Sequence, residues 1–277
     1  MFAFAANSLL CRLALEQPSI DPATFGTIRL ASGALMLAFI VRLRPDRKPP
    51  PRTDWLAAAM LFAYVAFFSF AYLGLPAGSG ALILFGAVQL TMLGAGLRAG
   101  ERFAPAAWAG LSAAIAGLVY LVSPGIAAPA PLGAALMAAA GVAWGIYSLR
   151  GRGVTDPLGI TAANFVRAVP LAVALNLVRA ADVHADGVGV ALAIASGAVS
   201  SGIGYAIWYA ALRGLSAMRA ATVQLSVPPI AAIGGALWLS EPLTVRLLLA
   251  SAAILGGIAV VLATRARAAG RAQAPSR

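Results

Sequence analysis

A succession of apolar runs, separated by short polar segments, makes up most of the chain. A helix needs about 20 residues to cross the roughly 30 Å of hydrocarbon in a bilayer, and nearly all of the runs reach that length. With 61% hydrophobic and only 10% charged residues, the chain is far more apolar than a soluble domain. We therefore expect an all-α integral membrane protein. Its ten expected transmembrane helices lie at about residues 1–15, 22–41, 55–73, 77–97, 105–123, 132–149, 158–178, 188–212, 217–239 and 245–263.

The first run is shorter than the others. It begins at Met1 and ends near residue 15, which is less than a comfortable span and leaves open whether the natural start lies upstream. The run contains Arg12 and has no basic segment before it. This pattern argues against a cleaved signal peptide.

The distribution of basic residues predicts how the chain is oriented. There are 20 Lys and Arg against 9 Asp and Glu. With ten spans and the N-terminus inside, most basic residues fall in inner segments and only Arg179 and Arg246 fall in outer loops. This positive-inside pattern predicts a multi-pass protein of the bacterial inner (plasma) membrane with both termini cytoplasmic. The positive charge thus reports orientation and contact with the lipid bilayer, not nucleic-acid binding.

An internal repeat divides the chain. An offset of 140 residues brings Glu101 onto Glu241 and Gly117 onto Gly257, and a slip of two pairs Arg29 with Arg167. We infer two five-helix repeats, residues 1–123 and 124–264, followed by a basic cytoplasmic tail, 265–277. Because five is odd, the second repeat enters the membrane from the other side, which gives inverted repeats. Glu101 and Glu241 are then expected on opposite faces, each near the N-terminus of the helix that follows it.

Short motifs recur in order along both halves. They are FAANS (4–8), RAGERF (98–103), AWGIY (143–147) and LSEPL (239–243). At these residues the chain resembles the drug/metabolite transporter superfamily, in particular EamA-type transporters. The resemblance implies a secondary transporter that exports a small organic metabolite, such as an amino acid, by alternating access. It also implies that the first and sixth spans line a central cavity, which makes Asn7 and Tyr147 candidates for substrate binding.

Two aromatic triplets and three amides are the candidate site chemistry. Each triplet has the spacing i, i+3, i+4 and is expected on one helix face, where aromatic rings bind apolar or cationic solutes; helix packing or an interfacial belt is the alternative. The amides lie in apolar runs, where an amide without a partner costs a few kcal/mol. The triplets are Tyr64, Phe67, Phe68 and Tyr205, Trp208, Tyr209. The candidate substrate-binding residues are Asn7, Tyr64, Phe68, Gln89, Trp144, Tyr147, Tyr205, Trp208 and Gln224.

Interruptions are expected in the two helices that carry Gln89 and Gln224. Gly86 and Gly94 flank Gln89, and a Pro228–Pro229 pair follows Gln224. Interrupted helices at equivalent positions of two repeats are typical of transporter sites, and a simple kink is the alternative. For Arg29 and Arg167, a structural role is favoured over binding of a substrate carboxylate.

The positions of the acids, the histidine and the cysteine argue against ion coupling, metal binding and enzyme activity. All acids fall in loops or at span ends, so no buried carboxylate is available to carry a proton or sodium ion, and facilitated exchange or efflux is favoured. His184 and its neighbouring aspartates (182–186) suit a solvated outer loop, and Cys11 stands alone; no metal site, cofactor or enzyme activity is expected. Drug or organic-cation efflux, a non-transporting scaffold and a homodimer stay open.

The doubled glutamates yield a test of topology. In a chain whose single cysteine has been replaced by Cys11→Ser, Arg98→Cys and Glu241→Cys should react with a membrane-impermeant thiol reagent from opposite faces of the membrane. The measurement is labelling of right-side-out and inside-out vesicles. Labelling of both positions from the same face would contradict inverted repeats.

Overall fold

The computed structural model describes residues 1–17, 19–44, 54–101, 103–212, 215 and 217–272. In this part of the chain the regular structure is helical, apart from an isolated antiparallel bridge between Ile20 and Ala185. Several basic residues used in the orientation argument lie outside the described residues, namely Arg47, Lys48, Arg52, Arg102, Arg213 and Arg277.

Each of the ten predicted runs coincides with one helix or with one helical segment made of several pieces. The single helices are α1 (Phe2–Glu16), α2 (Pro22–Arg42), α3 (Trp55–Ala71), α4 (Ala77–Arg98), α5 (Pro105–Val122), α6 (Pro131–Arg150), α7 (Pro157–Val178) and α12 (Val245–Ala272). The eighth run comprises α8 (Gly187–Ile194), the π-helix η2 (Ala195–Ile203) and α9 (Gly204–Leu212), and a 3-10 turn, η1 (Ala180–Asp182), precedes it. The ninth comprises α10 (Ala217–Gln224) and α11 (Val227–Trp238).

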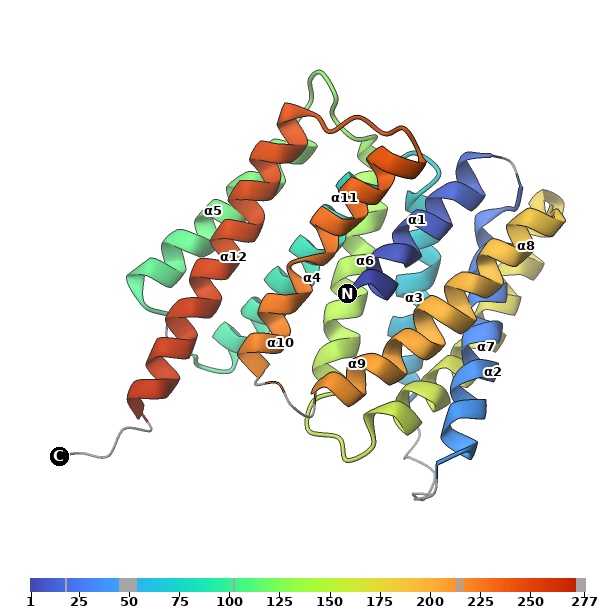
Figure 1. Cartoon of the computed structure of the whole chain (residues 1–277), viewed down its shortest axis with the longest axis horizontal. Helices are drawn as coiled ribbons and strands as arrows, with labels where there is room; N and C mark the ends of the chain where they lie inside the picture. The colour runs from blue at the N-terminus through green and yellow to red at the C-terminus, as the bar shows by residue number, and fades with distance from the viewer. Residues whose placement is uncertain (18, 45–53, 102, 213–214, 216, 273–277) are drawn as a thin grey trace.

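Eight of these helical segments are long and apolar enough to cross a membrane, and α3 is a shorter apolar helix. The predicted all-α membrane fold is therefore confirmed in the described residues. The 15-residue α1 is short, as its sequence indicates. Figure 1 shows its N-terminus at about mid-height of the bundle, whereas the C-terminal end of α12 lies at the lower end.

Local sequence explains where the helices begin. Proline is the first residue of α2, α5, α6 and α7, where its missing N–H costs no hydrogen bond. Aspartates cap four helix N-termini through side-chain oxygens that accept backbone N–H groups: Asp21, Asp54, Asp156 and Asp186. The backbone N–H of Gly189 lowers the pKa of Asp186. Loop carboxylates thus satisfy backbone donors that the helices themselves leave unpaired.

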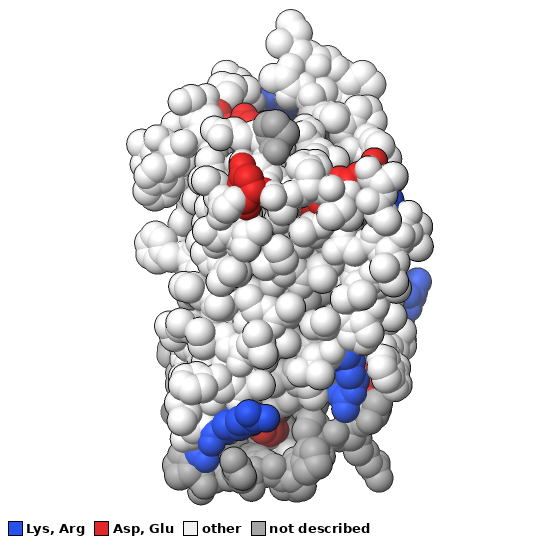
Figure 2. Space-filling view, turned by 90° about the vertical axis from the view of Figure 1, so that its right-hand side faces the viewer, with Lys and Arg blue, Asp and Glu red and all other residues white. Residues whose placement is uncertain are grey.

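Charged side chains gather at the two ends of the bundle. Figure 2 shows a wide band between them that is almost free of charge on the face in view. One end, called here the basic end, holds Arg44, Arg150, Arg152 and Arg265. The other, the acidic end, holds Glu16, Asp21, Asp182, Asp186 and Glu241. An uncharged band between charged ends is what hydrocarbon requires of the surface that faces it.

Glu101 and Glu241 lie at opposite ends of α4. The Glu241 carboxylate accepts the backbone N–H of Ala77, at the start of α4, at 2.7 Å. Glu101 follows the other end of the helix, where it pairs with Arg265. Glu241 therefore caps α4, and the expectation that it lies at the N-terminus of α12 is wrong. The reason is the chain reversal at Ser240, whose φ is 53°, which turns the carboxylate back over the bundle.

The pair α5–α12 shows how closely the helices approach. Figure 1 places this pair at one side of the bundle. A Cβ atom at Gly257 would lie 2.3 Å from the carbonyl oxygen of Gly110, and one at Gly110 would lie 2.5 Å from the carbonyl oxygen of Gly257. Small residues allow such backbone contact between membrane helices. Contact of this kind depends on glycine at both positions.

Neighbouring glycines in α12 give a matched test of this contact. Gly257→Ala should lower the free energy of unfolding by about 1–3 kcal/mol because the added methyl overpacks the interface. Gly256→Ala, whose Cβ would meet no atom within 4 Å, should leave stability unchanged or raise it through helix propensity. Thermal unfolding of the purified protein in detergent measures both. Equal stability of the two variants would contradict the predicted contact.

Candidate functional site

A cavity of about 700 Å³ lies inside the bundle. Side chains from α1, α3, α4, α6, α7, α9, α10 and α12 line it. It extends from the aromatic core to the basic end, where Arg150, Arg152 and Arg265 border it. This volume is in the range of cavities that hold small organic ligands.

Stacked aromatic rings form the inner wall of the cavity. The Trp144 ring, from α6, lies 5.8 Å from the ring of Tyr205 and 4.6 Å from that of Tyr64, centroid to centroid. The Tyr205 ring in turn stacks on Tyr209, at 5.9 Å, and meets Phe4 edge to face. The wall therefore joins α1, α3, α6 and α9, and it presents faces and edges of rings to any occupant.

A second, much smaller cavity of about 20 Å³ lies behind this wall. Trp144, Tyr205, Phe4 and Phe85 line both cavities. Arg29, from α2, also lines the smaller one and is only 2% exposed. The Arg29 guanidinium thus lies in the protein interior, separated from the large cavity by aromatic side chains.

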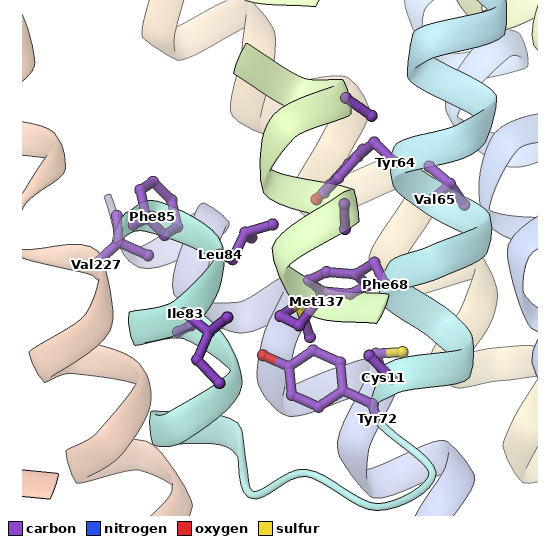
Figure 3. Close-up of a cluster of buried hydrophobic side chains, with 14 of the residues drawn as sticks. Cys11, Tyr64, Val65, Phe68, Tyr72, Ile83, Leu84, Phe85, Met137 and Val227 are labelled. Atoms are coloured by element: carbon purple, nitrogen blue, oxygen red, sulfur yellow. The ribbon is translucent and has the colours of Figure 1, made fainter. Parts of the chain in front are cut away.

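Two residues of α3 hold the Arg29 guanidinium. Its Nη2 donates to the hydroxyl oxygen of Tyr64 at 3.0 Å, and its Cζ lies 4.9 Å from the centroid of the Phe68 ring. Figure 3 shows Tyr64 and Phe68 following one another along one side of α3, above Tyr72. A cation over aromatic faces is stabilised by their quadrupoles, so this part of α3 fixes the orientation of the guanidinium.

Polar groups line the rest of the large cavity. Thr161, from α7, contacts the hydroxyl of Tyr147 at 3.3 Å and that of Tyr209 at 3.0 Å. Gln89 and Gln224 face the same cavity from α4 and α10. Asn164 lines it as well, and its Oδ1 accepts no hydrogen bond from the residues that the structure describes. These hydroxyls and amides offer donors and acceptors among apolar rings, an arrangement that orients a bound solute.

Asn7, the candidate residue of α1, is hydrogen-bonded within the protein. Asn7 is buried, and its Oδ1 accepts a hydrogen bond from the Ser196 hydroxyl in η2 at 2.7 Å. Asn7 also lines the smaller cavity. Its amide therefore joins two helices, while it stays at the edge of the candidate site.

The mouth of the large cavity is positively charged. Three arginines and one aspartate, Asp54, border it. Asp54 accepts a hydrogen bond from Arg150 at 2.8 Å, and this bond lowers the pKa of the carboxyl, which stays ionised at neutral pH. Basic side chains around an entrance raise the local concentration of anions.

All nine candidate residues from the sequence line one of the two cavities. Gln89, Trp144, Tyr147, Tyr205, Trp208 and Gln224 line the larger cavity, and Asn7, Tyr64 and Phe68 line the smaller one. Their proposed role in substrate binding stays a prediction. Phe67 lies apart from its triplet: it is 38% exposed. The expected single face is wrong for this residue because the buried side of α3 centres on Phe68 and faces away from Phe67.

The expected interruption is found in one of the two helices. The helix α4 is continuous through Gly86 and Gly94, so the expectation there is wrong; a glycine costs a helix only about 1 kcal/mol, and the space at Gly86 is filled by Ile254, 3.5 Å from an added Cβ. In the second half, the helix breaks between α10 and α11, just before Pro228.

Several lining residues were not among the candidates. Tyr209 belongs to a triplet that the sequence singled out, and Thr161 and Asn164 are polar positions three residues apart in an apolar run. That spacing puts both on one helix face and is the signal by which they could have been found. The burial of Arg29 had no such signal, because an arginine two turns into a span also suits a snorkelling side chain.

Comparisons with known proteins agree with this architecture. The EamA-like transporter family matches the chain twice, at residues 1–123 and 131–263. An uncharacterized protein of Pseudomonas aeruginosa is 53% identical over 98% of this chain and 94% of its own length. A protein of Streptantibioticus cattleyicolor, named as a probable terminal-alkyne amino-acid exporter, is 28% identical over 83% of this chain and 80% of its own.

Two further comparisons concern an archaeal protein and a solved structure. An uncharacterized transporter of Archaeoglobus fulgidus is 25% identical over 89% of this chain and 90% of its own length. A crystal structure with 22% identity superposes with a TM-score of 0.66 over 94% of this chain and 96% of the other, which is a likeness of fold. By its two family matches and its helices, the chain is a multi-pass membrane protein that belongs to the EamA-like transporter family.

Proposed function

We propose that the protein is a secondary transporter that exports a small organic metabolite, such as an amino acid, by alternating access between two inverted five-helix halves. The observation that carries this proposal is the 700 Å³ cavity, which reaches the basic end and whose inner wall is aromatic. A solute-sized cavity at mid-bundle is what a transporter requires and a membrane scaffold does not.

The orientation follows from charge. By the positive-inside rule, the basic end faces the cytoplasm of a bacterial inner membrane, and the C-terminal end of α12 is cytoplasmic. The cavity then faces inward, ready to take a solute from the cytoplasm. At the acidic end, the Glu241 carboxylate accepts from Arg12 at 3.2 Å and from the N–H of Ala77 at 2.7 Å, which ties α1 and α4 together and supports a closed outer side.

The local structure around Glu101, which follows α4, and around Glu241, which follows α11, supports inverted repeats. Glu101 donates its N–H to the carbonyl of Gly96, and Glu241 donates its N–H to the carbonyl of Gly235. In both places the carboxylate folds back over the glycine, to within 2.4–2.6 Å of where a Cβ would stand. The same local structure thus occurs at the two ends of α4, once from each half.

An amino acid is favoured as solute by the exporter among the relatives and by the combination of aromatic rings with polar groups in the cavity. The aromatic wall also suits an organic cation, the alternative that the sequence left open. The acid that borders the large cavity, Asp54, is paired with Arg150, so a cation would find no free carboxylate among the described lining residues. The lack of an unpaired carboxylate among the described lining residues also favours exchange or efflux without a titrating acid.

Counterflow in proteoliposomes tests transport directly. Vesicles are preloaded with unlabelled amino acids, organic cations or sugars, and uptake of the labelled compound is followed without an ion gradient. We expect uptake for amino acids and none for sugars. Uptake of organic cations alone would show that the solute is an organic cation and not an amino acid. If folded, inserted protein took up none of the compounds, facilitated exchange would be contradicted.

The two glutamines of the cavity give a second test. Gln89→Ala and Gln224→Ala should each lower the counterflow rate about tenfold, because each removes hydrogen bonds that orient a solute in a desolvated site. Gln17→Ala, at an exposed position after α1, should transport like the wild type. Rates are normalised to protein in the vesicles; unchanged flux in both cavity variants would remove the glutamines from the site.

A further inference from the structure

Arg29 differs from the other arginines whose contacts are described. Arg12, Arg44, Arg150, Arg179 and Arg265 each pair with a carboxylate. Arg246 donates to the backbone carbonyls of Leu121 and Ser123. Arg29 is 2% exposed, and its Nε and Nη1 have no hydrogen-bond partner among the described residues. Buried donors on a charged group are costly when unpaired. The Nε and Nη1 groups therefore need an acceptor, and the described part of the chain does not supply one.

The acids of the described chain are engaged elsewhere. The acids in ion pairs are Glu16, Asp54, Glu101, Asp156, Asp182 and Glu241. Asp21 and Asp186 cap helices. The side chains with polar atoms that share the small cavity with Arg29 are Asn7, Tyr64, Trp144 and Tyr205, and none of them is a carboxylate. The positive charge of an arginine, which proteins do not remove, therefore has no counter-ion among these residues.

We propose that Arg29 binds the carboxylate of the transported solute, which narrows the substrate class to small organic carboxylates with an apolar or aromatic portion. This inference rests on the proposed transport function. Tyr64 and Phe68 hold one edge and one face of the guanidinium, and the N–H groups on Nε and Nη1 are left for the solute. Charge-assisted bonds between guanidinium and carboxylate are among the strongest that side chains form.

The sizes of the two cavities fit a solute that bridges them. The small cavity of about 20 Å³ holds roughly one water-sized group, which is the size of a carboxylate oxygen. The rest of the solute would lie in the 700 Å³ cavity against Trp144 and Tyr205, which line both spaces. The carboxylate reaches Arg29 by passing between these rings, and the basic mouth draws anions toward them.

A binding experiment on the purified protein tests the chemistry. Four probes share one aromatic skeleton: L-phenylalanine and 3-phenylpropionate carry a carboxylate, whereas 3-phenylpropionamide and phenethylamine do not. A ligand that binds the folded state raises the unfolding temperature in proportion to its affinity and concentration. We expect both carboxylates to raise it in the wild type and the amide and amine to leave it unchanged.

Variants at position 29 locate the binding. Arg29→Gln removes the charge, and Arg29→Lys keeps the charge but loses the planar fork; both should weaken binding of the carboxylates by about tenfold or more. Arg42→Gln removes an exposed charge from the same helix and should bind like the wild type. If Arg29→Gln does not fold, Arg29→Lys and the comparison of 3-phenylpropionate with its amide in the wild type decide the question.

Three results overturn the proposal: equal binding of the amide or amine, full carboxylate affinity in the Arg29 variants, or no response to either carboxylate. Counterflow with the same four probes separates this proposal from transport itself. Exchange of phenethylamine but not of the carboxylates would support transport and refute carboxylate binding by Arg29. Carboxylate binding that depends on Arg29 but no exchange of any probe would support the site and refute transport.

Discussion

The absence of water from the bilayer core is the constraint on which the structure depends. Every backbone polar group there must be paired within the protein, which makes the chain helical, and every polar side chain must find a partner or leave the core. Aspartates therefore cap helices from the loops, and most described arginines with printed partners pair with acids at the two ends. Arg29 departs from this arrangement, since it is buried and its contacts in the described part of the chain are a phenol hydroxyl and aromatic rings.

The two ends of α4 connect this chemistry to movement. At the acidic end, Glu241 binds both Arg12 and the first turn of α4. At the basic end, Glu101 pairs with Arg265 at the other terminus of the helix, close to the mouth of the large cavity. Alternating access would require the acidic-end contacts to break as the basic end closes. In the proposed mechanism the helices would shift as packed units while the aromatic wall between them is preserved.

Sequence reasoning was strongest where one physical requirement acts alone. Hydrocarbon thickness decides the length of apolar runs, and the ten runs coincide with helical segments to within a few residues, except that α12 continues to Ala272, nine residues past the predicted end. Gln89 was identified because an amide without a partner is costly in an apolar helix, and Trp144 and Tyr205 because aromatic rings can bind a solute. Contacts between distant segments were not predictable: Glu241 caps α4, Phe67 leaves its triplet, and α4 runs through its glycines. Each of these outcomes depends on which neighbour fills the available space.

Alternating access is the central claim, and the width of the cavity mouth measures it most directly. Spin labels at Arg98→Cys and Arg152→Cys, two exposed positions at the basic end, report this width by pulsed electron resonance in a Cys11→Ser background. The account predicts two distance populations in lipid, with the shorter one enriched by Glu241→Gln, which weakens the contacts at the acidic end. A single distance that is the same with and without this substitution would contradict the account.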